Sequence, residues 1–396
     1  MINITQETQR CLQCKTAFCQ HGCPIKTPIP EIIHTLENNS LDAAGEILFN
    51  NNPLSLVCSL VCNHEQQCEG NCILNKKEAP IQFSVIENYI SDTYFDKMLI
   101  PIKKANNKKV AIIGSGPAGI TISLLLAKLG YNVTIFESKS ELGGVLRYGI
   151  PEFRLPKKIL KRYHKKLLDI GIKIRLNVTI GGTLKIDDLF RDGYLSIFAG
   201  TGTWRANRLG IEGESFGHVH YAIDYLASPE SFHLKDNVII IGMGNAAMDV
   251  ARTALRNGAK KVTLYARSDK FSANTIEYQK AKLDGADFQF NMSPIKFTNT
   301  GVIFIKTTKD SANEIHVDAD SIIISISQGP KDKLTMTTAG LNSSDKGLLI
   351  TNSIGNTTRT GIFAAGDVVH GAKSVVDAVN QAKLVAQSMD EYMSTL

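Results

Sequence analysis

The stretch of residues 108–154 limits what this chain can fold into more than any other part of the sequence. A β-branched run, Val110 to Ile113, leads into Gly114-x-Gly116-x-x-Gly119, and a second apolar run, Val133 to Phe136, ends at Glu137. In this pattern the glycines allow a tight turn, a close approach to a pyrophosphate and close helix–strand packing, and the acid accepts hydrogen bonds from a ribose. The stretch predicts a βαβ unit that binds a dinucleotide, without distinguishing FAD from NAD.

The same pattern occurs a second time. Val238 to Ile241 leads into Gly242-Met-Gly244-Asn-Ala-Ala247, a helical segment and the strand Val262 to Tyr265, after which the sequence reads Ala266-Arg267. A carboxylate at this place favours the free 2′-hydroxyl of NAD, whereas an arginine accommodates the 2′-phosphate of NADP. Arg267 therefore favours NADP(H), and an ordinary solvated arginine is the alternative. Two such patterns on one chain predict two nucleotides.

A third glycine-rich segment lies near the end of the chain. Thr360 to Asp367 predicts a strand that ends in Gly366-Asp367, followed by a helix that starts near Ser374. The Asp367 carboxylate could bind flavin ribitol hydroxyls, and the helix N-terminus could stabilise negative charge on a reduced flavin ring. A turn aspartate before a helix is the alternative, and Glu137 together with Gly143-Gly144 makes it the weaker one.

Composition indicates an ordinary soluble protein. The 396 residues are enough for two or three domains, and 43% are hydrophobic and 21% charged. A net charge of +6 does not argue for nucleic acid, and the absence of a long apolar run and of a signal peptide predicts a cytoplasmic protein with no membrane partner. The basic stretch Lys157 to Lys166 predicts a helix with a solvated face, and docking of an acidic carrier such as ferredoxin is the alternative.

All eight cysteines lie within the first 72 residues. Their spacings are Cys11-x2-Cys14-x4-Cys19-x3-Cys23-Pro24 and Cys58-x3-Cys62-x5-Cys68-x3-Cys72. A chain without a signal peptide is a poor candidate for a disulfide framework, and a four-cysteine run that ends in Cys-Pro favours iron–sulfur ligation over zinc, and both over buried thiols. No cysteine follows Cys72, which excludes a dithiol reductase of the thioredoxin-reductase kind.

Helical periodicity connects the two cysteine sets. Helices are predicted over Ile29 to Leu36, Leu41 to Phe49 and Pro80 to Ile90, where Pro28 and Pro30 open the first and the Asn50-Asn51-Asn52-Pro53 run closes the second. A small helical domain of this kind brings the two sets together. The basic stretch Lys103 to Lys109 reads as the linker to the nucleotide-binding part.

The chain resembles, over nearly its whole length, the small (beta) subunit family of NADPH-dependent glutamate synthase. It is similar too to the electron-entry region of dihydropyrimidine dehydrogenase and to the large subunit of NADH-dependent ferredoxin:NADP oxidoreductase. The resemblance is carried by Cys11 to Pro24, Val61 to Cys72, Gly143 to Pro156, Gly242 to Thr253 and Gly361 to Asp367. It implies an α/β fold with two Rossmann-like domains, an NADPH domain inserted into an FAD domain, after a small helical domain with two 4Fe-4S clusters. The expected limits are residues 1–105 for the cluster domain, 106–212 and 330–396 for the FAD domain, and 213–329 for the NAD(P)H domain.

The resemblance also implies ligands for each cofactor. One cluster would be held by Cys11, Cys14, Cys19 and Cys72, and the other by Cys23, Cys62, Cys68 and Glu87, with Cys58 in place of Glu87 as the competing assignment. The FAD contacts would be Gly114, Gly116, Ala118, Gly119, Glu137, Gly144, Val145, Arg154, Ile180, Gly366, Asp367 and Val375. The NADPH contacts would be Gly242, Gly244, Asn245, Ala246 and Arg267. The family commonly has paired basic residues after the second strand, and Ala266 replaces the first of them, so NADH is a possible donor as well.

The expected reaction is hydride transfer from NADPH to FAD, followed by release of single electrons through the clusters. Flavin and clusters carry this chemistry, so no catalytic side chain is named. Three interpretations are open: an electron-input subunit for a partner protein, a free-standing NAD(P)H:acceptor reductase that serves ferredoxin or small oxidants, and a non-catalytic zinc- and nucleotide-binding protein. The presence or absence of flavin and cluster absorption separates the third from the other two.

Overall fold

The chain forms two compact units in the computed structural model, which describes residues 2–38, 40–307 and 312–396. The first unit comprises Met1–Leu146, Glu152–Thr203 and Pro330–Leu396, and the second comprises Arg147–Pro151 and Trp204–Gly329. The exact domain limits expected from the sequence stay predictions. Within the ranges described, no helix combines the length and the apolar character needed to cross a bilayer.

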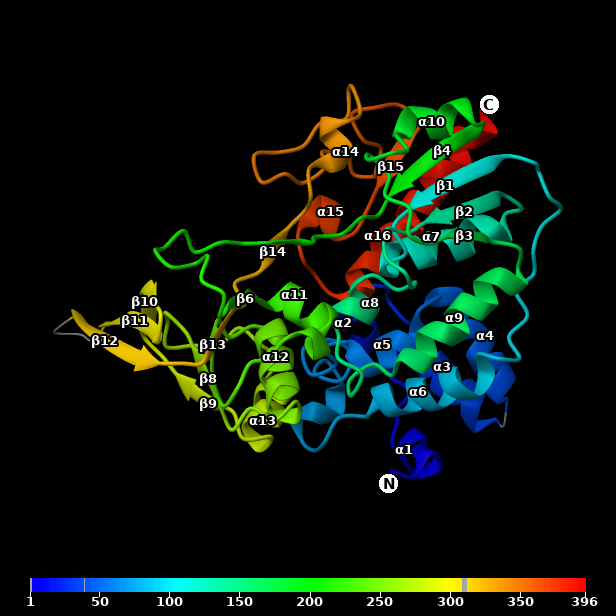
Figure 1. Ribbon diagram of the computed structural model, residues 1–396. Helices are drawn as coiled ribbons and strands as arrows, with labels where there is room; N and C mark the ends of the chain where they lie inside the picture. Colours follow the sequence, from blue (N-terminus) through cyan, green and yellow to red (C-terminus); the bar gives the residue numbers. More distant parts are fainter. Residues whose placement is uncertain (1, 39, 308–311) are drawn as a thin grey trace. The chain divides into compact units, whose positions relative to one another are not determined.

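The first unit begins with a bundle of short helices that carries all the cysteines (blue in Figure 1). Its apolar centre includes the fully buried Ile32, Ile33, Leu48, Ile86 and Ile90. The helices predicted at residues 29–36 and 41–49 are confirmed, and the third begins later than predicted, at Phe83, because Pro80 to Gln82 belong to no helix. The elements are α1 (Ile4–Gln9), α2 (Phe18–Gly22), α3 (Ile29–Glu37), α4 (Leu41–Asn51), α5 (Ser55–Val61), the 3-10 helix η1 (Ile73–Lys76) and α6 (Phe83–Tyr94).

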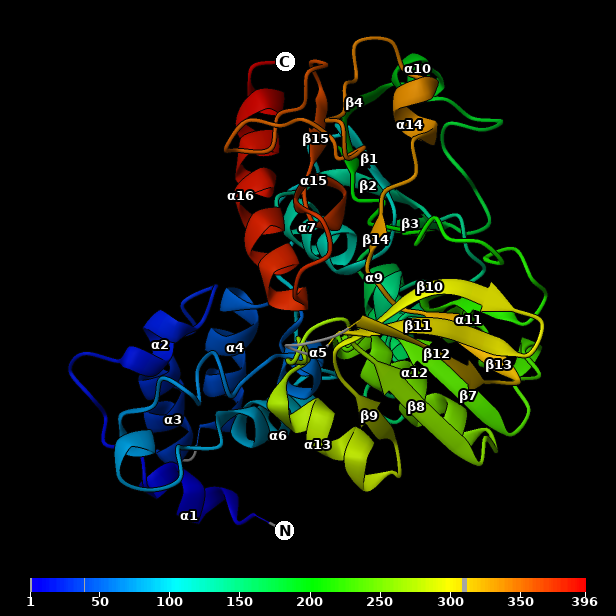
Figure 2. The same cartoon turned by 90° about the vertical axis from the view of Figure 1, so that its left-hand side faces the viewer.

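A five-stranded parallel sheet follows in the same unit. Its order is β15-β4-β1-β2-β3, with Ile112 of β1 opposite Ile135 of β2 and Phe198 of β4. The strands are β1 (Lys109–Ile113), β2 (Asn132–Phe136), β3 (Lys173–Arg175), β4 (Tyr194–Ala199) and β15 (Ile362–Ala364). Helices α7 (Pro117–Lys128) and α16 (Val375–Ser394) pack side by side against it, as Figure 2 shows. The short helices are α10 (Ile186–Arg191), α14 (Lys333–Met336) and α15 (Asp367–His370), and α8 (Val145–Tyr148) begins in this unit and ends in the second.

Helix α9 (Lys157–Asp169) joins the sheet to the cysteine-bearing helices. Its Tyr163 is fully buried, donates a hydrogen bond to the Pro53 carbonyl at 3.0 Å and packs its ring 4.6 Å from that of Phe95. The prediction of a wholly solvated basic face is wrong for two of its residues. Arg162 pairs with Asp92 and Asp96, and Lys166 donates to the carbonyls of Asp96 and Met98, because the end of α6 presents acceptors there.

The second unit contains another five-stranded parallel sheet. Its order is β6-β13-β7-β8-β9, all parallel, and helices α11 (Ala222–Ala227), α12 (Asn245–Arg256) and α13 (Thr275–Leu283) belong to it. The strands are β6 (Val219–Tyr221), β7 (Asn237–Ile241), β8 (Lys261–Tyr265), β9 (Asp287–Gln289) and β13 (Ser321–Ile324). An antiparallel sheet of β10 (Met292–Thr298), β11 (Gly301–Thr307) and β12 (Ala312–Asp318) adds to it, and β5 (Arg205–Ala206) pairs with β14 (Gln328–Gly329).

Candidate functional site

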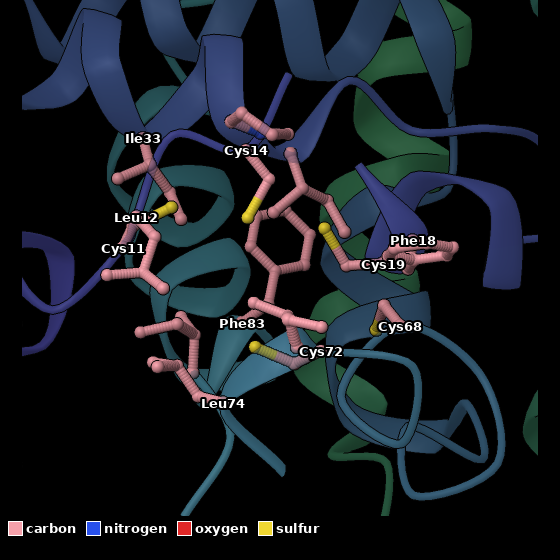
Figure 3. A pocket seen from close by; sticks show the side chains of 14 residues that line it. Cys11, Leu12, Cys14, Phe18, Cys19, Ile33, Cys68, Cys72, Leu74 and Phe83 are labelled. Carbon is pink, nitrogen blue, oxygen red and sulfur yellow. The ribbon is translucent and has the colours of Figure 1, made fainter. Parts of the chain in front are cut away.

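Four cysteines surround one cavity among the first helices. The sulfur atoms of Cys11, Cys14, Cys19 and Cys72 face its centre, and Cys68 lies at its edge (Figure 3). Four thiolates are the donor set of a 4Fe-4S cube, and walls without charged groups keep water away from it. The other lining residues are Leu12, Phe18, Ile29, Pro30, Ile33, Ile73, Leu74, Ile81 and Phe83.

These four thiols are close enough to influence one another's charge. Burial, with smaller contributions from the neighbouring Cys72, Cys11 and Cys14, raises the pKa of Cys19 to about 11. Burial raises the pKa of Cys11 as well, with Cys14 and Cys72 acting in the same direction. Ligation needs thiolates, so a bound cation has to supply the charge that keeps such thiols deprotonated. Across the described parts of the chain, no three His, Cys, Asp or Glu side chains lie close enough together to hold a single metal ion.

The remaining predicted cluster ligands gather between α5 and α6. A hydrogen bond with Cys58 and burial raise the pKa of Cys62 strongly, and Glu87 and Cys68 add to the effect. Burial raises the pKa of Cys68, with further contributions from Glu87 and Cys23. The structure thus brings Cys23, Cys62, Cys68 and Glu87 into one neighbourhood, from loops and helices far apart in the sequence.

Glu87 is a buried carboxyl group held from one side. The Ser55 hydroxyl donates to Glu87 Oε1 at 2.6 Å, and the Ser91 hydroxyl donates to Ser55 Oγ at 3.0 Å. Both serines are fully buried, and Glu87 is 5% exposed. Burial raises the pKa of Glu87 to about 8, while the bond from Ser55 acts against the rise. A carboxylate at this depth requires a positive partner, which the iron of a cluster would be.

Cys58 lies one turn before Cys62 on α5 and is buried. Its thiol is hydrogen bonded to Cys62, and after burial its charge adds to the raised pKa of the Tyr163 hydroxyl of α9. Both candidates for the fourth position therefore flank Cys62. Glu87 differs from Cys58 in that it acts on Cys68 as well.

The glycines of the first nucleotide pattern have the conformations that their proposed roles need. Gly114 has φ +97°, and a methyl group there would lie 2.5 Å from the Gly200 carbonyl oxygen. A methyl at Gly119 would lie 2.0 Å from the Gly114 carbonyl, so α7 packs directly against the turn. A methyl at Gly116 would meet no atom within 4 Å, so this position faces open space. Gly144 lies over it, because its own methyl would lie 2.8 Å from the Gly116 Cα.

Glu137 directly follows strand β2 and is anchored on both oxygens. Oε2 accepts from the Ser115 N–H at 2.9 Å and from the Ser115 hydroxyl at 2.6 Å, and Oε1 accepts from Lys139 N–H at 2.8 Å and Ser138 Oγ at 3.2 Å. The Ser115 oxygen in turn accepts from Gly143 N–H at 3.0 Å. Ser115 thereby joins the glycine turn to the Gly143-Gly144 loop. Sequence reasoning missed it, although it occupies the variable position of the Gly-x-Gly signal.

The other predicted flavin contacts belong to the same sheet and its helices. A methyl at Gly366 would lie 3.4 Å from the Ala118 Cβ, and the Gly366 N–H donates to Gln381 Oε1 at 2.8 Å. Burial raises the pKa of Asp367 to about 6, and Lys373 N–H donates to its carboxylate at 3.2 Å. Val375 opens α16 after a capping box of Ser374 and Asp377. Ile180 is buried just beyond β3, Val145 opens α8, and Arg154 lies in the extended segment before α9.

The second nucleotide pattern has the same turn with a different strand end. Gly242 has φ +126°, and a methyl there would lie 2.2 Å from the Ser325 carbonyl oxygen. Asn245 and Ala246 are exposed at the start of α12, and Asn245 Oδ1 accepts from Asn274 N–H at 2.8 Å. At the end of β8, Ala266 is buried and Arg267 is exposed. Of these two residues the arginine is the one that can offer a cation to a nucleotide.

Comparison with known proteins gives two family matches. A family model described as pyridine nucleotide-disulphide oxidoreductase matches residues 108–382, and one described as dihydropyrimidine dehydrogenase domain II, 4Fe-4S cluster, matches residues 2–99. The glutamate synthase (NADPH) small chain of Halomonas elongata is 30% identical over 98% of this chain and 90% of that protein. The NAD-dependent dihydropyrimidine dehydrogenase subunit PreT of Salmonella typhimurium is 31% identical over 98% of this chain and 94% of that protein.

Solved structures share the nucleotide-binding fold. FprA from Mycobacterium tuberculosis superposes with a TM-score of 0.61 at 18% identity, over 73% of this chain and 85% of that chain. Thioredoxin reductase from Lactococcus lactis superposes with a TM-score of 0.58 at 22% identity, over 73% of this chain and 100% of that chain. The expectation of two Rossmann-like domains after a helical iron–sulfur domain is confirmed.

Proposed function

The chain belongs to the pyridine nucleotide-disulphide oxidoreductase family and is an NAD(P)H-dependent flavin and iron–sulfur oxidoreductase, and we propose that it is the electron-input subunit of a larger enzyme. Bound FAD would take a hydride from NAD(P)H, and two 4Fe-4S clusters would carry single electrons onward. The relatives are themselves a small chain and a subunit, which supports a partner protein. We propose as partner a glutamate synthase large chain or the catalytic subunit of a dihydropyrimidine dehydrogenase.

One observation carries this proposal. The cysteine-bearing helices and the flavin-type sheet belong to one compact unit, joined through Tyr163 of α9 and through α16. A flavin bound at the sheet and clusters bound at the cysteines would therefore keep a fixed relation to each other, which single-electron transfer requires. The chain contributes binding, orientation and exclusion of water, and no side chain is assigned a proton-transfer role.

The proposed nucleotide contacts follow from the glycine turns and strand ends. Gly114, Gly116, Gly119 and Gly144 would form the surface for the FAD pyrophosphate, with the other flavin contacts named above around it. A ribose hydroxyl would reach Glu137 on the Oε1 side, where the Ser138 contact of 3.2 Å is the longest of the four. Gly242, Gly244, Asn245 and Ala246 would receive the second nucleotide, with Arg267 at its adenosine end.

The proposed cluster ligands are Cys11, Cys14, Cys19 and Cys72 for the first cluster and Cys23, Cys62, Cys68 and Glu87 for the second. The charge of Glu87 raises the pKa of both Cys62 and Cys68, which supports Glu87 over Cys58. Glu87→Ala should remove or degrade one cluster and spare the other, as measured by iron content and electron paramagnetic resonance. Cys58→Ala is the matched control and should retain both. Two intact clusters in the Glu87 variant, or loss of one in the Cys58 variant, would reverse the assignment.

Anaerobic purification tests the function as a whole. We expect bound FAD, iron and sulfide for two clusters, flavin bleaching by NADPH, and a catalytic subunit that co-purifies from its own cells. Rapid turnover with ferredoxin and no co-purifying subunit would favour the free-standing reductase. A colourless protein that contains zinc would refute both.

A second donor is supported by one departure from the family pattern. Ala266 stands where the family has the first of two basic residues, and the PreT relative is described as NAD-dependent. The ratio of kcat/KM for NADPH and NADH decides between the two donors. We propose NADPH as the preferred donor on the strength of Arg267.

A further inference from the structure

Cys23, a predicted cluster ligand, is connected to the flavin-type fold by a chain of hydrogen bonds that runs through Thr27 and Asn51. Its Sγ lies 3.2 Å from the Thr27 hydroxyl, and that hydroxyl donates to Asn51 Oδ1 at 3.1 Å. The Asn51 amide nitrogen donates to the Ile25 carbonyl at 3.1 Å, which fixes the orientation of this side chain. The Asn51 main-chain carbonyl then accepts from the Lys383 ammonium at 2.7 Å.

Lys383 belongs to α16, the helix that begins at Val375 in the predicted flavin site. Eight residues separate the two, which is about 12 Å along a helix axis. Lys383 is half-buried, and burial lowers its pKa while the nearby Cys23 thiol acts in the opposite direction. The helix thus places a positive charge, held by a main-chain carbonyl, beside one ligand of the second cluster.

The hydrogen-bond directions around Thr27 depend on the charge of Cys23. A hydroxyl has one proton, and Thr27 gives it to Asn51, so the Cys23 thiol is the donor in the contact described. A thiolate ligand can only accept. When Cys23 is ligated, the Thr27 hydroxyl has to turn and donate to the sulfur, which is a charge-assisted bond in a buried place.

We propose that Lys383 and Thr27 raise the reduction potential of the cluster that Cys23 holds, and so set the direction of electron flow from the flavin side. Reduction adds negative charge to the cluster, and both a nearby cation and a hydrogen bond to a ligand sulfur stabilise the reduced state. The inference rests on the proposed function, since it needs Cys23 as a ligand. Lys383 and Thr27 are positioning residues, because neither is a ligand of the cluster.

Lys128 provides a matched control. It lies on α7 of the same fold and donates to the side chain of Asn50 at 3.0 Å, in an exposed contact one residue before Asn51. Loss of this solvent-screened charge should leave the potentials unchanged. The pair Lys383→Met and Lys128→Met therefore separates a local effect on Cys23 from a general loss of positive charge between the two regions.

The experiment is a redox titration of the whole FAD-loaded protein monitored by electron paramagnetic resonance. Lys383→Met should lower the midpoint potential of one cluster by about 59 mV, a tenfold fall in its reduction equilibrium constant, and leave the other unchanged. Lys383→Arg should restore the wild-type value, and Thr27→Val should lower the same potential while Thr27→Ser keeps it. Iron, sulfide and FAD contents equal to those of the wild type show that each variant is intact.

The outcomes separate this inference from the proposed function. Cys23→Ser should lose one cluster, and two intact clusters in that variant would refute the ligand set itself. Loss of one cluster in Cys23→Ser together with unchanged potentials in Lys383→Met would overturn only the tuning role. If Lys383→Met does not retain its clusters, Thr27→Val and Thr27→Ser decide the question, and equal potentials in these two would overturn it.

Discussion

The two parallel sheets share the order of four strands, β4-β1-β2-β3 in one and β13-β7-β8-β9 in the other, and differ in the residues that follow β2 and β8. In the flavin-type sheet β2 is followed by Glu137, a carboxylate anchored by four donors. In the second sheet β8 is followed by the buried Ala266 and the exposed Arg267. The same βαβ framework therefore presents a negative charge in one place and a positive charge in the other.

This difference teaches where nucleotide identity is encoded. Both turns are built alike, since Gly114 and Gly242 have positive φ and each lies within contact of a carbonyl from a neighbouring strand's end. The turn serves any pyrophosphate, and the strand end distinguishes a ribose with free hydroxyls from one that bears a phosphate. Substitutions at either glycine turn should therefore abolish binding of the nucleotide at that turn. Substitutions after β2 should remove a negative charge that binds a ribose, whereas those after β8 should remove a positive charge that binds a phosphate.

The largest effect is expected at the second glycine of each turn. Gly116→Ala should abolish FAD binding without unfolding the chain, because a methyl there meets no protein atom yet enters the space proposed for the pyrophosphate. Gly244→Ala, where a methyl would lie 3.6 Å from Ser272 Oγ, should retain FAD and lose reduction by NADPH. Flavin content and thermal unfolding of each variant measure this. A flavin-loaded Gly116→Ala protein would show that the pyrophosphate binds elsewhere.

Glu137→Gln should lower both the affinity for FAD and the free energy of unfolding of the chain. One carboxylate oxygen becomes an NH2 group that has to face an existing donor, either Ser115 or Lys139, and a buried unmatched donor costs about 1–3 kcal/mol. We expect about a tenfold or greater rise in the Kd for FAD. Fluorescence titration of the flavin and urea unfolding of the FAD-free chain measure the two effects. Unchanged affinity would remove Glu137 from the FAD site.

Arg267→Ala should weaken the use of NADPH about tenfold and leave NADH nearly unchanged, because it removes a charge-assisted contact with the 2′-phosphate. The measurement is KM for both donors in the FAD-loaded enzyme. Lys261→Ala, at the exposed start of the same strand, is the control and should change neither. Equal effects of Arg267→Ala on both donors would show that the arginine does not read the phosphate.

The smallest effect is a pH dependence of FAD binding. Burial raises the pKa of Asp367 to about 6, so its carboxylate should be half protonated in the FAD-free chain near that pH. Only the ionised form accepts two ribitol hydroxyls, so the Kd for FAD should rise about twofold from pH 7.5 to 6 and further below. Asp367→Asn should abolish this dependence. The raised pKa has the opposite consequence for folding of the FAD-free chain: stability from this group is present below its unfolded value and is lost as the pH rises through about 6.

Much of the fold could be predicted because the strongest patterns are local. The two βαβ stretches and the helices at residues 29–36 and 41–49 were predictable from periodicity and glycine spacing. The antiparallel sheet of β10 to β12 was not predictable, because its strands form their main-chain hydrogen bonds with one another and contain no glycine motif. Strand β3 was not predictable in its length, because it covers only Lys173–Arg175 and pairs with β2 over three positions.

The site was predictable in its ligand types and less so in its supporting residues. The cysteine spacings pointed to clusters, yet Ser55, Ser91 and Thr27 carry no motif, and only the packing of α5 against α6 and of the Cys23 loop against Asn51 reveals them. The partly wrong prediction for α9 has the same origin. Whether Arg162 and Lys166 contact water or the segment from Asp92 to Asp96 depends on which helix packs beside them. A single sequence does not show which helices are neighbours.

The hydrogen bonds of Tyr163, Lys383 and Lys128 to residues 50–53 have a practical consequence for the transfer of the cysteine-bearing helices to another protein. Residues 101–108 form no helix or strand and look like a convenient place to cut. After such a cut the cysteine-bearing helices would still be held by the hydrogen bonds at the Pro53 carbonyl and at Asn50 and Asn51. If they were separated from the sheet, they would expose the Phe95 ring and the carbonyls of Asn51 and Pro53 that α9 and α16 now contact. Grafting should therefore carry α7, α9 and α16 along with the cysteines.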